Sequence, residues 1–155
     1  MFVRAVSLSL LSILAFSANA AGSGMAPRPG LWEHTISGDR TATPIKLKMC
    51  VGTPESGENP FGPQSEEDDA ECSTNEIKRI ATGLSYLSVC PLNNGTMTSK
   101  GTVTGDLSTS YRTSGTIEVS GVALEPGESK VSRIQTSARY LGACPAGMEP
   151  GDTAP

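Results

Sequence analysis

Apolar and polar residues alternate along much of this chain. Between residues 45 and 51, Ile45, Leu47 and Met49 alternate with Lys46 and Lys48. Successive side chains of a β-strand point to opposite faces, so this pattern predicts a strand with one buried face. Similar short runs, bounded by Gly, Pro, Asn and Asp, predict seven strands in all. They cover residues 31–36, 45–51, 72–80, 84–90, 97–103, 111–120 and 131–141.

The segments between these strands carry turn signals. Asn94-Gly95 favours a tight hairpin, because both residues tolerate positive φ. Thr53-Pro54-Glu55 is typical of a helix start, but nearby Gly and Pro residues limit it to one turn. No longer helical pattern is present. We therefore expect a mostly β fold: a single-domain antiparallel meander that forms a curled sheet or a small barrel, stabilised by disulfides.

The first 20 residues have the three parts of a secretory signal peptide. A positive start ends at Arg4, an apolar run covers residues 5–16, and Ala18 and Ala20 occupy the small-residue positions of a cleavage site. The apolar run is shorter than the roughly 20 residues that span a bilayer. We therefore expect an exported, periplasmic protein with no membrane span after cleavage. A flexible lead-in would cover residues 21–28, and one domain would cover residues 29–152.

The charge balance bears on the choice of partner. The chain has 12 Lys and Arg against 16 Asp and Glu, a formal net charge of −4. Cleavage after Ala20 removes Arg4 and no acid, which leaves 11 of those 12 basic residues and a charge of −5. Nucleic acids and anionic membranes are bound by basic surfaces, so this balance argues against a nucleic-acid partner.

The four cysteines are Cys50, Cys72, Cys90 and Cys144. An even number of cysteines in an exported chain predicts a disulfide framework. The chain has no C-x-x-C pair and only one histidine, so we expect no metal site. Four cysteines allow three connectivities. Cys50–Cys72 with Cys90–Cys144, and Cys72–Cys90 with Cys50–Cys144, both remain open at this point.

Few residues are candidates for catalysis. His34 is the only histidine, and no nucleophile motif lies near it, so it is better explained as a partly buried structural residue. Trp32 suits the core of a small domain, although an aromatic face also stacks well on a ligand. The acidic residues 66–69 and Glu71 lack the alternating spacing of an EF-hand calcium loop, and a solvated loop is the better interpretation. We expect no cofactor.

Four segments form a distinctive set when taken together. They are Pro29-Gly30-Leu31-Trp32-Glu33, Met49-Cys50-Val51 followed by Thr53-Pro54-Glu55, the run from Ala138 to Met148 around Cys144, and Pro150-Gly151-Asp152. This set resembles the exported bacterial family catalogued as domain of unknown function 3617, over about residues 29–152. The resemblance implies a proteobacterial origin and a periplasmic location. It implies no activity, since none is assigned to the family. The Gly- and Pro-rich acidic stretch after Glu55 departs from the more helical segment expected there.

These observations favour a non-catalytic domain that binds a small apolar ligand or another envelope protein. A curled antiparallel sheet presents a concave apolar face. The residues expected to line it are Trp32, Ile36, Tyr86, Tyr111, Ile117 and Tyr140. Two alternatives stay open: a hydrolase that uses carboxylates alone, and a structural or stress-related envelope protein that acts through an exposed sheet edge.

Overall fold

The computed structural model describes residues 24–55, 58–62, 72–92, 94–124 and 127–154. Within these ranges the secondary structure is entirely β, in eight strands. They are β1 (Gly30–Gly38), β2 (Ile45–Val51), β3 (Thr74–Ile80), β4 (Gly83–Leu92), β5 (Gly95–Gly105), β6 (Ser110–Ser120), β7 (Val131–Gly142) and β8 (Thr153–Ala154).

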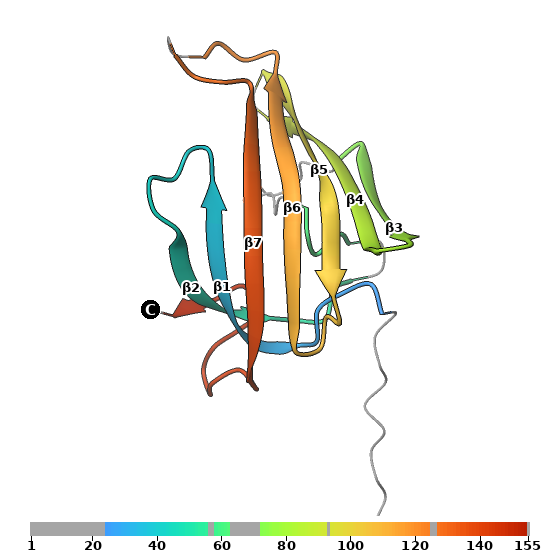
Figure 1. Ribbon diagram of the computed structural model, residues 1–155, viewed down its shortest axis with the longest axis vertical. Coiled ribbons are helices and arrows are strands. Elements are labelled where there is room, and N and C mark those ends of the chain that lie inside the picture. The colour runs from blue at the N-terminus through green and yellow to red at the C-terminus, as the bar shows by residue number, and fades with distance from the viewer. Residues whose placement is uncertain (1–23, 56–57, 63–71, 93, 125–126, 155) are drawn as a thin grey trace, which may run out of the picture.

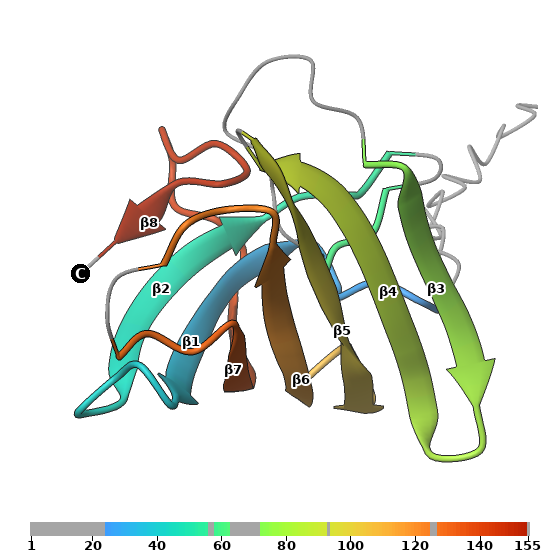
Figure 2. The ribbon, with the colours of Figure 1, turned by 90° about the horizontal axis from the view of Figure 1, so that it is seen from above.

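The strands form one antiparallel sheet in the order β3-β4-β5-β6-β7-β1-β2-β8. Strands β3 to β7 form the predicted meander, but the β1–β2 hairpin lies beyond β7 rather than beside β3 (Figure 1). The sheet is curled and open, because β3 pairs only with β4, and β2 and β8 form the other edge (Figure 2). The curled sheet is therefore confirmed, and the alternative of a closed barrel is wrong.

All seven predicted strands are present, with ends that differ from the prediction by at most two residues. The eighth strand was not expected. It is only two residues long, and it pairs with Lys48 and Met49 of β2. Thr53-Pro54-Glu55 is not helical, and the Glu58 amide donates to the Glu55 carbonyl (3.1 Å). Gly95 pairs with Leu92, so it opens β5 instead of lying in the turn.

The alternating pattern gives the sheet two different faces. We call the face that carries Trp32, Tyr86 and Tyr111 the inner face, and the opposite face the outer face. The inner face holds the core at one end of the strands. Its buried members are Trp32, Leu84, Tyr86, Val103, Leu107, Tyr111 and Ala138. The outer face is mostly Ser, Thr and charged residues, which an antiparallel sheet tolerates because one face can remain in water.

Residues 58–62, which lie between β2 and β3 in the chain, pack against the inner face. Figure 1 shows them passing behind β6 and β5. Phe61 packs against Tyr86 and Tyr111, with ring centroids 6.3 and 5.7 Å apart. The Asn59 side-chain amide donates to the Ser88 hydroxyl (3.0 Å), and Ser88 donates to Asn75 (2.9 Å). Because Asn59 and Ser88 are almost completely buried, this hydrogen bond fixes where the segment crosses the sheet.

Residues 24–28, expected as a lead-in, close one end of the core. Met25 packs on the core cluster, and the Arg28 guanidinium lies 4.5 Å from the Tyr140 ring centroid. The Trp32 indole N–H donates to the Arg28 carbonyl oxygen (2.8 Å), which satisfies the polar atom of a fully buried side chain. This part of the predicted lead-in therefore packs as part of the domain.

The two disulfides are Cys72–Cys90 and Cys50–Cys144. Cys72–Cys90 joins the residues just before β3 to β4, and Cys50–Cys144 joins β2 to the C-terminal segment. The C-terminal segment is also held against β2 by backbone hydrogen bonds. The Cys50 amide donates to the Asp152 carbonyl (2.9 Å), and the Gly151 amide donates to the Cys50 carbonyl (2.8 Å).

Candidate ligand-binding site

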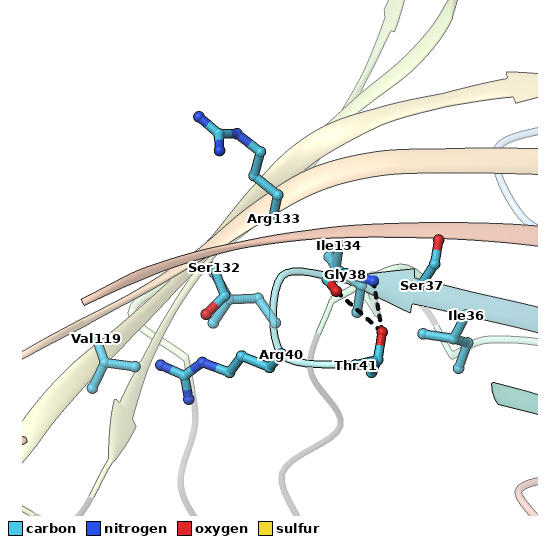
Figure 3. Close-up of a pocket in the computed structure, with 10 residues that line it drawn as sticks. Ile36, Ser37, Gly38, Arg40, Thr41, Val119, Ser132, Arg133 and Ile134 are labelled. Atoms are coloured by element: carbon cyan, nitrogen blue, oxygen red, sulfur yellow. Dashed lines mark hydrogen bonds between the residues drawn. The ribbon is translucent and has the colours of Figure 1, made fainter. Parts of the chain in front are cut away.

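An apolar groove lies on the inner face, at the end of the strands away from the core. Its volume is about 160 Å³. The lining residues come from β1, β6, β7 and the turn after β1 (Figure 3). They are Ile36, Ser37, Gly38, Arg40, Thr41, Ile117, Val119, Ser132, Arg133 and Ile134.

The strand register explains why aliphatic side chains meet there. Residue Ile134 of β7 pairs with Gly38 of β1 on one side and with Gly115 of β6 on the other. Ile36 is level with Thr136 of β7 and Ile117 is level with Ser132, so the three isoleucines form a diagonal row on one face with Ile134 in the middle. All three are only half-buried, in contrast to Trp32 on the same strand as Ile36. This end of the inner face is therefore an unfilled apolar surface.

The turn after β1 closes one side of the groove. The Thr41 hydroxyl accepts from the Gly38 amide (3.0 Å) and donates to the Gly38 carbonyl (3.1 Å). A carboxylate oxygen of Asp39 accepts from the Arg133 backbone amide (3.0 Å), which attaches the turn to β7. A β-carbon at Gly38 would lie 2.5 Å from the Arg133 carbonyl oxygen, so glycine is needed where β1 closes on β7. These contacts hold the next residue, Arg40, at the groove.

Arg40 contributes a positive charge to this apolar site. Its Nη2 donates to the Ser129 carbonyl oxygen (2.8 Å), which anchors the side chain to the loop between β6 and β7. In Figure 3 the Arg40 side chain extends past Ser132 towards Val119, whereas the Arg133 guanidinium points to the other side of the sheet. Within the described ranges, no Asp or Glu forms an ion pair with Arg40.

Of the four aromatic residues predicted to contact a ligand, Trp32, Tyr86 and Tyr111 are buried in the core, and the partly buried Tyr140 packs against it. Trp32 is 0% exposed, and its ring is 5.1 Å from the Tyr111 ring and 5.4 Å from the Tyr140 ring. Tyr86 and Tyr111 are also buried, and burial raises the pKa of both hydroxyls. For Tyr86, a hydrogen bond with Ser99 opposes part of that increase in pKa. Of the six residues expected on a concave surface, Ile36 and Ile117 line the groove.

His34 lies between the core and the groove on β1. It is 6% exposed, and its ring meets the Tyr111 ring edge-on at 6.1 Å. Burial lowers the pKa of the imidazole, and Nε2 has no hydrogen-bond partner in the described structure. A neutral imidazole packed against a tyrosine fits the structural role expected from the sequence.

The described residues give little support to metal binding or to thiol chemistry. No group of three or more His, Cys, Asp or Glu gathers there to hold a metal. The acidic residues 66–69 and Glu71 lie outside the described ranges. All four cysteines are in disulfides.

Strand β3 presents Glu76, Lys78 and Arg79 along one sheet edge, and charges of this kind discourage edge-to-edge pairing. No helix in the described part of the chain is of the length and apolarity that crossing a membrane requires.

Sequence reasoning missed three important groove residues: Arg40, Val119 and Ile134. Val119 and Ile117 share one parity on β6, so the alternating pattern could have found Val119. Ile134 required the β1–β7 pairing, which joins residues about 100 positions apart and has no local signal. Arg40 had no signal beyond its place after the Gly38-Asp39 turn.

The comparison with protein families gives a clear match. Residues 27–144, more than half of the chain, match the family described as "Protein of unknown function (DUF3617)". The chain belongs to this family. Neither a curated protein nor a solved structure matches the chain significantly. The family assignment confirms the resemblance seen in the Pro29-Gly30-Leu31-Trp32 start and in the run before Cys144, and the family's description names no activity.

Proposed function

We propose that this member of the DUF3617 family is a non-catalytic binding protein that holds a small apolar ligand in the inner-face groove. The observation that carries the proposal is the unfilled half of the inner face. Ile36, Ile117 and Ile134 form a half-buried apolar row there, although Trp32, Tyr111 and Ala138 on the same strands are buried at the other end. Apolar side chains left half-exposed in a concave site favour an apolar ligand, because binding removes their surface from water.

The size of the groove limits the ligand. A closed cavity of about 150 Å³ lined by aliphatic and aromatic side chains binds benzene. The groove, at about 160 Å³, therefore accommodates one ring or a short stretch of a single hydrocarbon chain. Larger ligands would extend out of its open side. The proposal therefore specifies only the apolar part of the ligand, which lies in the groove, and does not require the whole ligand to be enclosed.

The proposal places the protein in the periplasm. Two disulfides support an oxidising compartment, because cytosolic thiols are kept reduced. The signal-peptide pattern of residues 1–20 supports export. The buried state of the only histidine supports a role without acid–base catalysis.

The test is binding of an uncharged fluorescent probe, N-phenyl-1-naphthylamine, to the purified protein. A matched pair of variants separates groove binding from surface binding. Ser132→Phe fills the groove, whereas Ser137→Phe places the same ring on the outer face of the same strand. We expect saturable binding to the wild type and to Ser137→Phe, and at least about tenfold weaker binding to Ser132→Phe. No saturable binding to the wild type, or equal binding to both variants, would overturn the proposal. Unfolding curves establish that both variants are folded.

A further inference from the structure

We propose that the groove ligand carries an anionic head group and that Arg40 binds this group. The inference rests on the proposed function, because it concerns the same groove, and it adds the chemical class of the ligand. The ligand is an anionic amphiphile: a single hydrocarbon tail that ends in a carboxylate or a phosphate.

Arg40 is held at the groove by a hydrogen bond that uses only part of its guanidinium group. A guanidinium group has five N–H donors, and one of its nitrogens is bonded to the Ser129 carbonyl oxygen. This single anchor fixes the position of the group while most of its donors remain available. Arginine pairs well with carboxylate and phosphate oxygens, because its planar fork matches their geometry. An anchored arginine loses less side-chain entropy when it binds an anion than a mobile one does.

Arg40 also forms no ion pair with any acid in the part of the chain that the structure describes. The nearest acid in sequence, Asp39, is already bonded to the Arg133 amide and lies 3.9 Å from the Arg133 guanidinium. Across the described ranges, the ion pairs are Lys78–Glu76, Arg133–Asp39 and Arg139–Glu33, and none includes Arg40. The protein as a whole is acidic, with a formal net charge of −4. A cation that has no ion-pair partner among the described residues and lies beside an apolar groove is complementary to a ligand that is both anionic and apolar.

The groove places the positive charge of Arg40 beside an apolar surface. Arg40 comes from the turn at the rim, and the three isoleucines come from the strands beneath. Figure 3 shows the Arg40 side chain on the same side of the sheet as Ile134 and Ser132. A head group at Arg40 would therefore leave its tail over Ile36, Ile117 and Ile134. Ionic contact at one end and apolar contact at the other select an amphiphile over a plain hydrocarbon.

The experiment compares three ligands with the same ten-carbon chain: decanoate, decyl phosphate and decanol. Each is titrated against protein loaded with N-phenyl-1-naphthylamine, and displacement gives its affinity. The variant Arg40→Met keeps an unbranched apolar side chain and removes the charge. Arg40→Lys keeps the charge without the planar fork, and Arg112→Met removes an exposed arginine from the outer face as the matched control.

For the wild type and Arg112→Met, we expect at least one of the two anions to bind about tenfold or more tightly than decanol. Arg40→Met should lose this preference, so that it binds the two anions no more tightly than decanol, and Arg40→Lys should lie between the wild type and Arg40→Met. A preference for decanoate identifies a carboxylate ligand, and a preference for decyl phosphate identifies a phosphate ligand. Equal affinity for all three ligands in the wild type, or a preference that survives in Arg40→Met, would overturn this inference but leave the groove proposal standing. Failure of the probe to bind at all would instead overturn the groove proposal.

Discussion

The phenolic oxygen of Tyr86 lies directly over Gly115, two strands away in the sheet. A β-carbon built on Gly115 would be 2.5 Å from that oxygen and 2.6 Å from the Lys100 carbonyl oxygen. Gly101 pairs with Gly115 on the intervening strand, and a β-carbon there would lie 2.7 Å from the same Tyr86 oxygen. The two facing glycines thus leave room for a large side chain across the sheet, an arrangement that offsets the weakness of glycine in strands.

This contact predicts that Gly115→Ala is destabilising. The added methyl group overlaps Tyr86 and the backbone of β5, and overpacking of this kind typically costs about 1–3 kcal/mol. Ser114→Ala, one residue earlier and on the outer face, is the control and should change the free energy of unfolding by less than about 0.5 kcal/mol. Tyr86→Phe combined with Gly115→Ala should recover part of the loss, since one of the two overlaps is removed. Urea unfolding measures all three, and a Gly115→Ala protein as stable as the wild type would contradict the structure.

The Ser88 hydroxyl predicts a second stability effect. Ser88 is 0% exposed, and its hydroxyl links Asn59, between β2 and β3 in the chain, to Asn75 of β3. Ser88→Ala removes both hydrogen bonds and leaves the buried Asn59 amide nitrogen without this partner, at a cost of about 1–3 kcal/mol. Ser85→Ala, on the same strand but the outer face, should have little effect. Hydrogen exchange should also become faster at Phe61 and Gly62 in Ser88→Ala alone, and unchanged protection there would argue against this anchor.

His34 predicts a dependence of stability on pH. Burial lowers the pKa of folded His34 below its ordinary value of 6.5, so the unfolded chain binds the proton more tightly. The contribution of His34 to the free energy of unfolding is therefore fully present above about pH 6.5. It decreases as the pH falls below that value towards the pKa of the folded protein. His34 is the only histidine, so no other imidazole titrates in this range.

The variant His34→Phe checks this assignment. It keeps a ring against Tyr111 and removes the titrating group as well as the unpaired Nε2. Urea unfolding between about pH 5 and pH 8 should show a smaller loss of stability on acidification than in the wild type. The same slope in both proteins would show that the pH dependence has another source.

The two disulfides predict unequal losses of stability. Cys72–Cys90 closes a separation of 18 residues, and Cys50–Cys144 closes one of 94. If restriction of the unfolded chain dominates, replacing the first pair by serine costs about 3 kcal/mol and replacing the second costs about 4.7 kcal/mol. Unfolding of the two double variants under identical conditions measures this order. The reverse order would show that local packing at β3 outweighs chain entropy.

The strands could be predicted closely because their signal is local. Alternation of apolar and polar residues, as in Ile45 to Val51, depends only on which face of the strand is buried. The even number of cysteines likewise predicted disulfides, and the Pro29-Gly30-Leu31-Trp32 start with the run before Cys144 predicted the family. None of these inferences required knowledge of which strands become neighbours.

The sequence alone therefore determined the strands, their two faces and the family of this protein. The tertiary structure decided what lies beside what: β1 beside β7, Cys50 beside Cys144, and Arg40 over the groove. It also separated core from groove. Trp32 and Ile36 have the same parity on β1 and look equivalent in sequence, yet the end of the inner face that holds Trp32 is packed by residues from distant strands and loops, whereas Ile36 stays half-buried. The alternation of apolar and polar residues predicts which face a side chain points to. The burial of that side chain depends on which distant residues cover the face.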